Sequence, residues 1–375
     1  MLSSANWTFR SCRFLLTVCG IFLIFTPAPK ADVPAHTESA SWSQRSSLAI
    51  HSLQSWYDAQ TGLYKTTGWW NSANVLTTLA DYSKVTGSRE FDSVFRNTLS
   101  AAQKTSPGFI NRFYDDEGWW ALAWIDAYDL TGDQRYLAMA ESIFADMAGG
   151  WDNTCAGGIW WSKDRTYKNA IANELFLSVA AHLGSRAKSL RDRKQYLKWA
   201  TREWRWFSHS GMINPDHLVN DGLDAKCVNN QKTTWTYNQG VIVGALVEFS
   251  RAGHTSRLLH TATVIAAAAL SAPALVDAHG VLHEPCEPNC GGDGSQFKGI
   301  FVRNLRSLDE AASLPPYHKF IFTNADSIWS GTRAPDYHLG LIWSAPFGEV
   351  NASTQSSAAD VLVSAMEAEK VKTSR

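Results

Sequence analysis

The stretch that decides the fold is EGWWALAWIDAYDLTG, residues 117–132. Starting from Trp120, its Ala, Trp and Tyr side chains recur at i, i+3, i+4, i+7 and i+8, which is the spacing of one helix face. Gly132 follows directly, and glycine is typical of the position just after a helix because it tolerates a left-handed conformation. The stretch therefore predicts a helix that stops at Gly132.

Four other stretches show the same kind of helical run, and most of them also stop at a glycine. They are WWNSANVLTTLADYSKVTG (69–87), NAIANELFLSVAAHLG (169–184), TWTYNQGVIVGALVEFSRAG (234–253) and FKGIFVRNLRSLDEAA (297–312). More polar helices are expected near 39–57, 89–104, 133–148, 189–208, 255–271, 315–330 and 355–368. With about 12 helices and little strand-like alternation, the sequence predicts an all-α chain.

The first two runs repeat one pattern. The runs at 69–87 and 117–132 each have Trp-Trp near the start and Thr-Gly at the end, and Trp69 and Trp119 are 50 residues apart. Such a period indicates stacked helical hairpins, here about six. Loops on one side are long, so we expect a closed α/α toroid whose functional face carries them, with an open solenoid as the alternative. Helices that follow the long loops would form the inner ring. These loops span 150–167, 209–233 and 272–295.

Composition and the amino-terminal region indicate a secreted protein. The net charge of −1 gives no electrostatic reason to expect nucleic acid or an acidic membrane surface as a partner. Arg10 and Arg13 precede the apolar run FLLTVCGIFLIF (14–25), which is typical of a signal peptide and short for a membrane span. A membrane anchor is the alternative. The charged C-terminus shows no lipid-anchor tail, so we expect no stable membrane anchor.

Four cysteines remain after the signal peptide, an even number in an oxidising compartment. Cys286 and Cys290 flank a turn-forming Glu-Pro-Asn, so we expect them to pair locally and Cys155 to pair with Cys227. A zinc site is the alternative, but the usual double Cys-x-x-Cys or Cys/His spacing is missing. Asn351 begins an Asn-Ala-Ser glycosylation signal.

The segment YDDEGWW, residues 114–120, places two adjacent aspartates at the start of the second inner helix. One aspartate suffices to cap a helix, and capping is the simpler interpretation of the pair. Glycoside hydrolysis also needs two carboxyls, about 5–5.5 Å apart for retention of configuration and farther apart for inversion. Because adjacent Cα atoms are about 3.8 Å apart, Asp115 and Asp116 suit the retaining distance.

Aromatic and amide side chains gather at the starts of the inner helices, and the chain has 17 tryptophans. Aromatic rings stack on the apolar faces of sugars and amides bind their hydroxyls, although capping and buried hydrogen bonds explain many such residues equally well. Asp221 is either a ligand on a loop or part of an Asp-Gly turn. The candidate sugar contacts are Trp69, Trp70, Asn74, Trp119, Trp160, Trp161, Asn169, Asp221, Tyr237, Asn238 and Lys298.

Five ordered segments together resemble glycoside hydrolase family 76, the α-1,6-mannanases and related fungal cell-wall enzymes. They are YDDEGWWALAWIDAYDLTGDQRYL, CAGGIWWSKDRTYKNAIANELF, DGLDAKC, WTYNQGVIVGAL and FKGIFVRNL, within about residues 40–345. The resemblance implies an (α/α)6 toroid, a retaining mechanism and an endo-acting site for α-1,6-linked mannose. It implies Asp115 as nucleophile, Asp116 as acid/base, Asp221 as a substrate contact and Tyr237 near the sugar. Ser162 departs from the family's usual Gln after Trp, which affects sugar contacts rather than the reaction.

We therefore expect a monomeric, secreted mannan endo-1,6-α-mannosidase that needs no cofactor and no metal. Its parts would be a signal peptide (1–31), an (α/α)6 catalytic domain (36–350) and a C-terminal tail, helical or partly disordered (351–375). One alternative is a transglycosylase acting on the mannose core of glycolipid (GPI) anchors in the fungal cell wall. Another is a non-catalytic glycan-binding protein. A terpenoid cyclase would need Asp-Asp-x-x-Asp, and Trp119 stands at the fifth position.

Overall fold

The computed structural model describes residues 40–253, 255–312 and 317–373. The chain divides after Ala40 into two units, and the architecture below belongs to the second, which begins at Ser41. The expected signal peptide, residues 1–31, lies outside the described residues. Within the three described ranges, none of the helices combines the length and apolar character that a membrane crossing requires.

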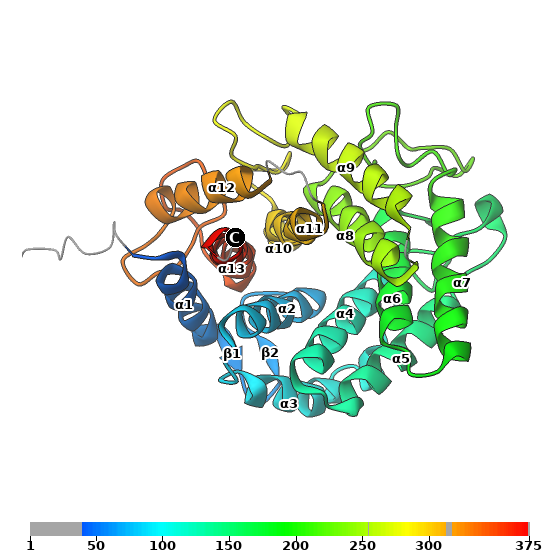
Figure 1. The fold of residues 1–375 in the computed structure, drawn as a ribbon, viewed down its shortest axis with the longest axis horizontal. Helices are drawn as coiled ribbons and strands as arrows, with labels where there is room; N and C mark the ends of the chain where they lie inside the picture. Colours follow the sequence, from blue (N-terminus) through cyan, green and yellow to red (C-terminus); the bar gives the residue numbers. More distant parts are fainter. Residues whose placement is uncertain (1–39, 254, 313–316, 374–375) are drawn as a thin grey trace, which may run out of the picture. The chain divides into compact units, whose positions relative to one another are not determined.

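Six helices form a closed inner ring (Figure 1). Each inner helix packs against the next one along the chain, and the last packs against the first, so the ring has no open end. The predicted (α/α)6 toroid is therefore confirmed, and the open solenoid is wrong. The inner helices are α2 (Trp69–Thr86), α4 (Tyr114–Thr131), α6 (Ala170–Arg186), α8 (Thr236–Gly253), α11 (Phe297–Ala311) and α13 (Ala352–Thr373).

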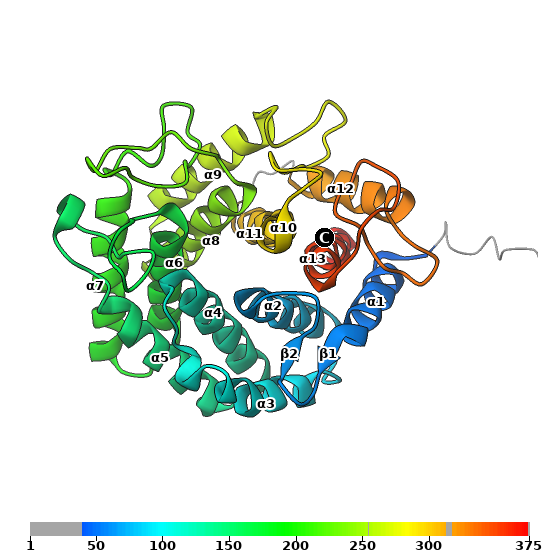
Figure 2. The same cartoon turned by 180° about the vertical axis from the view of Figure 1, so that it is seen from behind.

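Six further helices lie outside this ring, which Figures 1 and 2 view from opposite sides. They are α1 (Trp42–Leu53), α3 (Asp92–Ala101), α5 (Gln134–Ala148), α7 (Leu190–Phe207), α9 (Ser256–Ser271) and α12 (Tyr317–Gly331). Smaller elements are β1 (Tyr57–Asp58), paired antiparallel with β2 (Leu63–Tyr64), the four-residue α10 (Gly291–Gly294) and the 3-10 helices η1 (Gln54–Trp56), η2 (Ala102–Lys104), η3 (Pro107–Phe109) and η4 (Thr154–Ala156).

The segment after residue 350 is not a tail. It forms α13, the sixth inner helix, and residues 352–366 are all buried. Asn351 lies just before this helix, and its side-chain oxygen accepts the Thr354 N–H at 3.0 Å, as an N-cap residue does. Glycosylation of Asn351 stays a prediction, while the domain boundary expected at residue 350 is wrong because the ring closes through α13.

At two glycines, neighbouring inner helices lie so close that no side chain fits between their backbones. A Cβ at Gly240 of α8 would lie 2.5 Å from the Cα of Phe301 in α11. A Cβ at Gly299 of α11 would lie 2.5 Å from the Cα of Ser357 in α13. Both contacts are with backbone atoms, so a side chain there could be accommodated only by moving a helix.

Gly299→Ala should therefore destabilise the protein by about 1–3 kcal/mol, although alanine normally favours a helix over glycine. Thermal unfolding measures this effect. Gly348→Ala is the matched control, because a Cβ at Gly348 meets nothing within 4 Å. Equal unfolding temperatures for the two variants would contradict the close approach of α11 and α13.

Candidate active site

The two adjacent aspartates lie in the first turn of α4, as expected. They stand at the rim where long loops lead into α6, α8 and α11. A cavity of about 250 Å³ opens there, and it is lined by side chains from the starts of four inner helices, α2, α4, α8 and α11, and from the loops before α6, α8 and α11. Its lining residues are Trp70, Asp115, Trp119, Trp161, Tyr167, Asn169, Asp221, Tyr237, Asp293 and Phe297.

Each aspartate is held by one hydrogen-bond donor. Oδ2 of Asp115 accepts the indole N–H of Trp161 at 3.0 Å, and Oδ2 of Asp116 accepts the Asn111 amide at 2.6 Å. Asn111 is itself fixed, since its side-chain oxygen accepts the Phe113 N–H at 2.8 Å. Oδ1 of Asp115 is buried and has no hydrogen-bond partner among the described residues. Asp115 thus lines the cavity with one carboxylate oxygen that no other group of the protein pairs with among the described residues.

The electrostatics of the pair keep one proton on it near neutral pH. Burial and the neighbouring charge of Asp116 raise the pKa of Asp115 to about 8. Burial also raises the pKa of Asp116 to about 6, although the hydrogen bond from Asn111 lowers it in part. Near neutral pH the pair therefore combines one carboxylic acid with one carboxylate. Acid–base chemistry on a bond between two such groups needs this combination.

Four aromatic rings form one wall of the cavity. Trp70 stacks on Trp119 with ring centroids 5.5 Å apart, and Tyr237 stacks on Phe297 at 3.7 Å. Trp119 and Tyr237 are also parallel to within 23°, so the rings form one continuous surface. The indole N–H of Trp70 donates to Asp293 at 2.9 Å and fixes the orientation of its ring. Such a wall suits the apolar face of a sugar.

The remaining wall comes from the loops before α6 and α8. The Tyr167 hydroxyl donates to Asp221, and Asn230 donates to Tyr167 at 2.9 Å. Burial and the hydrogen bond to the Asp221 carboxylate raise the pKa of Tyr167. Asn169 caps α6 by accepting the Ala172 N–H at 3.3 Å. Asp221 is thus held by other residues while still facing the cavity, where it can accept hydrogen bonds from hydroxyl groups.

Several expected sugar contacts lie in the cavity lining, and others do not. Those in the lining are Trp70, Trp119, Trp161, Asn169, Asp221 and Tyr237. Trp69 instead packs against Trp120 at 4.8 Å and against Phe109, within the aromatic core. Trp160 donates its indole N–H to Asp152 at 2.7 Å and is not part of the cavity lining. Neither of these two tryptophans lines the cavity, whereas their sequence neighbours Trp70 and Trp161 do.

Three other expected contacts are structural. Asn74 is buried inside the ring, where its oxygen accepts the guanidinium of Arg303. Lys298 is buried in an ion pair with Glu287, and it also donates to the Leu341 carbonyl at 2.7 Å. Asn238 is fully buried in α8, outside the lining of the cavity. The structure therefore places these three residues outside the lining of the cavity.

Sequence reasoning missed Tyr167, Asp293, Phe297 and Asn111. Phe297 could have been found, because it is an aromatic residue in the first turn of an inner helix, as Trp70 and Tyr237 are. Asp293 lies in the four-residue α10, which no helical periodicity announces. Asn111 precedes α4, and only the folded chain shows that its amide reaches Asp116.

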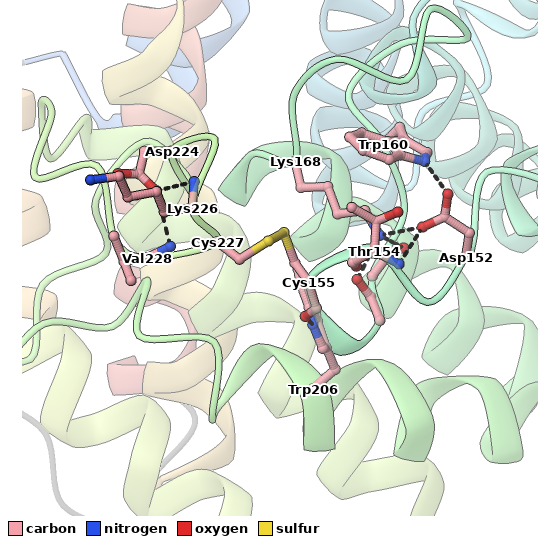
Figure 3. Close-up of a disulfide and its surroundings, with 12 residues drawn as sticks. Asp152, Thr154, Cys155, Trp160, Lys168, Trp206, Asp224, Lys226, Cys227 and Val228 are labelled. Atoms are coloured by element: carbon pink, nitrogen blue, oxygen red, sulfur yellow. Dashed lines mark hydrogen bonds and ion pairs between the residues drawn. A yellow bond between two sulfur atoms is a disulfide. The ribbon is translucent and has the colours of Figure 1, made fainter.

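Both expected disulfides are present, and one of them joins the rim loops (Figure 3). Cys155 before α6 is bonded to Cys227 before α8, so the cysteines do not serve a zinc site. Beside this bond the buried ammonium of Lys168 donates to Asp152 at 2.8 Å and to the carbonyls of Thr154, Gly157 and Gly158. With four acceptors, the ammonium of Lys168 has all of its N–H groups engaged in hydrogen bonds.

Lys168 therefore fixes the rim from behind. It lies between Tyr167 and Asn169 in sequence, and both of those neighbours line the cavity. Partial burial opposes ionisation of Asp152, but hydrogen bonds from Lys168, Trp160 and the Thr154 N–H outweigh it and lower its pKa to about 2. This ion pair contributes stability above the unfolded pKa of aspartate, about 4, and the contribution disappears as pH falls towards 2.

Lys168→Met should lower the free energy of unfolding by about 3 kcal/mol, because it leaves Asp152 and three carbonyls without their shared donor. Thermal unfolding at pH 7 is the measurement, and Lys226→Met is the control because Lys226 is exposed on the other loop of the same disulfide. At pH 2 the difference between wild type and Lys168→Met should shrink. A difference that persists unchanged at pH 2 would contradict the role of the ion pair.

A helical toroid with a carboxyl pair beside an aromatic wall has the features of a glycoside hydrolase. The sequence model of glycosyl hydrolase family 76 matches residues 41–374, and the chain belongs to this family.

Similar proteins come from fungi and bacteria. The chain is 32% identical over 213 residues to the mannan endo-1,6-alpha-mannosidase DCW1 of Eremothecium gossypii, covering 51% of this chain and 45% of that protein. It is 24% identical over 326 residues to DFG5 of Saccharomyces cerevisiae, also named a mannan endo-1,6-alpha-mannosidase, covering 79% and 70%. The match with DCW1 thus spans about half the length of that relative.

Two solved structures share the fold. One is an inactive variant of the α-1,6-mannanase GH76A of Salegentibacter sp. HEL1_6 in complex with α-1,6-mannotetrose, with TM-score 0.80, 24% identity and coverage of 87% of this chain and 99% of that one. The other is Dfg5 of Chaetomium thermophilum in complex with glucosamine, with TM-score 0.75, 20% identity and coverage of 88% and 90%.

Proposed function

We propose that the protein is a secreted, retaining glycoside hydrolase that cleaves α-1,6-mannosidic bonds within mannan chains. The observation that carries this proposal is the pair Asp115–Asp116, which shares one proton beside a cavity with an aromatic wall. The names of the relatives supply the substrate class, since DCW1 and DFG5 are mannan endo-1,6-alpha-mannosidases.

A relative supports the role of the pair. The Salegentibacter mannanase was made inactive by replacing two consecutive aspartates with alanine, and this variant holds α-1,6-mannotetrose. Asp115–Asp116 is the one place in the present sequence where two aspartates are consecutive. Adjacent residues suit the short carboxyl separation of a retaining enzyme, because one side chain must reach the anomeric carbon and the other the glycosidic oxygen.

The mechanism follows from these positions. Asp115 attacks the anomeric carbon and forms a covalent glycosyl-enzyme, while Asp116 protonates the departing oxygen. Asp116 then takes a proton from water, and this water attacks the same carbon and displaces Asp115. The released sugar therefore keeps its original anomeric configuration. Attack requires Asp115 to be ionised and the proton of the pair to lie on Asp116. The Trp161 indole N–H favours this arrangement because it stabilises the ionised form of Asp115.

Azide distinguishes the two roles. Asp115→Ala lacks the nucleophile, so azide should attack an aryl α-1,6-mannobioside directly and give a β-mannosyl azide. Asp116→Ala keeps the nucleophile, so azide should attack the glycosyl-enzyme and give an α-mannosyl azide. Both variants should lose activity on α-1,6-mannotetraose by a factor of about 10³ or more while keeping the wild-type unfolding temperature. NMR of the products identifies them, and exchanged configurations would reverse the assignment.

The pH profile of kcat/KM should be bell-shaped, with limbs near pH 6 and pH 8. Below the lower limb both carboxyls are protonated and the nucleophile is lost, and above the upper limb no acid remains. Asn111→Ala removes the hydrogen bond that lowers the pKa of Asp116, so the acidic limb should move to higher pH. Asn289→Ala, at an exposed turn, is the control. An unmoved limb in Asn111→Ala would contradict this role.

Transglycosylation of glycolipid anchors is a second candidate, because a sugar hydroxyl can replace water on the same glycosyl-enzyme. The Chaetomium relative was solved with glucosamine, so a site of this fold accepts sugars other than mannose. Products longer than the α-1,6-mannotetraose supplied would indicate transfer, and shorter products alone would indicate hydrolysis. Binding without any turnover by the wild type would instead support a non-catalytic glycan-binding protein.

A further inference from the structure

The outer surface of α7 carries an unusual concentration of positive charge. Five exposed cations follow one side of this helix, over about 21 Å at the usual rise per residue. The whole chain, by contrast, has a net charge of −1. The five residues are Arg191, Lys194, Lys198, Arg202 and Arg205, and we call them the α7 stripe.

The α7 stripe is not neutralised by the protein. None of its members forms an ion pair within the described part of the chain. The two acids of α7 are engaged elsewhere, since Asp192 accepts the Ser189 hydroxyl at 2.6 Å and Glu203 is fully buried. Lys194–Lys198 and Lys198–Arg202 are like-charged pairs at i, i+4, which disfavour the helix. A stripe that costs stability suggests a role in binding.

Two adjacent hollows run along this surface. One, of about 510 Å³, is lined by residues of α7 from Arg191 to Arg202. The other, of about 500 Å³, lies between the end of α7 and the loop of Trp151, Cys155 and Ala156. Arg202 lines both, so the two hollows adjoin at this residue, and we call them together the groove. Among the described residues, no aspartate or glutamate lines either hollow.

Aromatic rings lie beneath the charges. The guanidinium of Arg202 sits 4.2 Å from the ring centroid of Trp151 and 5.1 Å from that of Trp199. Trp151 and Trp199 are half-buried and each lines one of the hollows. Rings that hold a guanidinium in place and remain partly open offer both a fixed charge and a surface for a sugar ring.

We propose that this groove is a second carbohydrate site, which binds an anionic polysaccharide. Phosphate or carboxylate groups spaced along a sugar chain would meet the α7 stripe, and the sugar rings would lie against Trp151 and Trp199. A membrane surface is a poorer match, because Leu190 is the one large exposed apolar side chain of α7. A double-stranded nucleic acid would use the charges but not the partly open tryptophans, because its bases are already stacked inside the duplex.

The groove shares no lining residue with the cavity that holds Asp115. It is nevertheless attached to the same rim, because Lys168 binds the carbonyls of Thr154, Gly157 and Gly158 in the loop that borders the second hollow. A polymer in the groove would hold the protein on an acidic glycan without occupying the cavity. The inference goes beyond the proposed reaction and stands whether or not Asp115 and Asp116 hydrolyse mannan.

Dextran sulfate and neutral dextran test the proposal, since they share a sugar backbone and differ in charge. The full mature protein should bind dextran sulfate in isothermal titration with an affinity that falls as salt rises, and should not bind dextran measurably. Lys198→Glu/Arg202→Glu should weaken this binding by about tenfold or more. The control Lys65→Glu/Lys104→Glu changes the net charge equally at exposed sites away from α7 and should keep wild-type affinity.

The competing outcomes separate the alternatives. Equal losses in the two double variants would overturn the site, because binding would then depend on net charge alone. Polyphosphate or double-stranded DNA binding as tightly as dextran sulfate would overturn its carbohydrate character. Turnover of α-1,6-mannotetraose by Lys198→Glu/Arg202→Glu should equal that of the wild type, and a parallel loss of turnover and unfolding temperature would show damage to the fold. Arg202→Gln alone would then supply the milder test, with a reduced dextran sulfate affinity expected.

Discussion

Closure of the inner ring is the constraint on which the rest of the structure depends. An inner helix has neighbours on both sides, an outer helix behind it and the ring interior in front, so most positions along it are buried. α6 is buried from Ala170 through Ala181 for this reason. In α4, Asp115 and Asp116 are only partly buried, because the start of this helix lies at the rim. The start of an inner helix also suits a carboxylate, because the N-terminal end of the helix dipole favours negative charge.

Charged side chains pair across the ring interior below the cavity. Arg303 pairs with Asp360 at 3.2 Å, and Arg306 pairs with Asp81 at 3.0 Å and Glu367 at 2.9 Å. These pairs connect α11 to α13 and α2, so they join the last inner helix to the first. Removing one partner of such a pair leaves a buried charge, which makes their geometry strongly preferred. Arg303 also lies 5.9 Å from the ring of Trp119, the residue between this interior and the cavity.

This packing explains which features the sequence could predict. Helix existence and the ring follow from periodicity and loop lengths, because both are local. The segment from residue 351 was expected to be a tail because it contains polar residues such as Ser353, Gln355 and Ser357. All three are buried in the structure. Gln355 accepts the Leu339 N–H and Ser357 accepts the Gly299 N–H, so their polarity serves contacts distant in sequence. Asn74 and Lys298 were assigned to the sugar for the same reason, and Asn111 and Asp293 were missed because only the fold brings them to the site.

The rim is fixed before any sugar arrives, and this bears on how the carboxyl pair can work. The Cys155–Cys227 bond and the four acceptors of Lys168 hold the loops that carry Tyr167 and Asn169. A ligand entering such a site orders little of the protein, so more of its binding free energy is available for other changes. In the proposed reaction one such change is the placement on Asp116 of the proton that the pair carries near neutral pH, so that Asp115 is ionised. Contacts of the substrate with each carboxyl would decide this placement, because hydrogen bonds to the ionised form of a carboxyl lower its pKa.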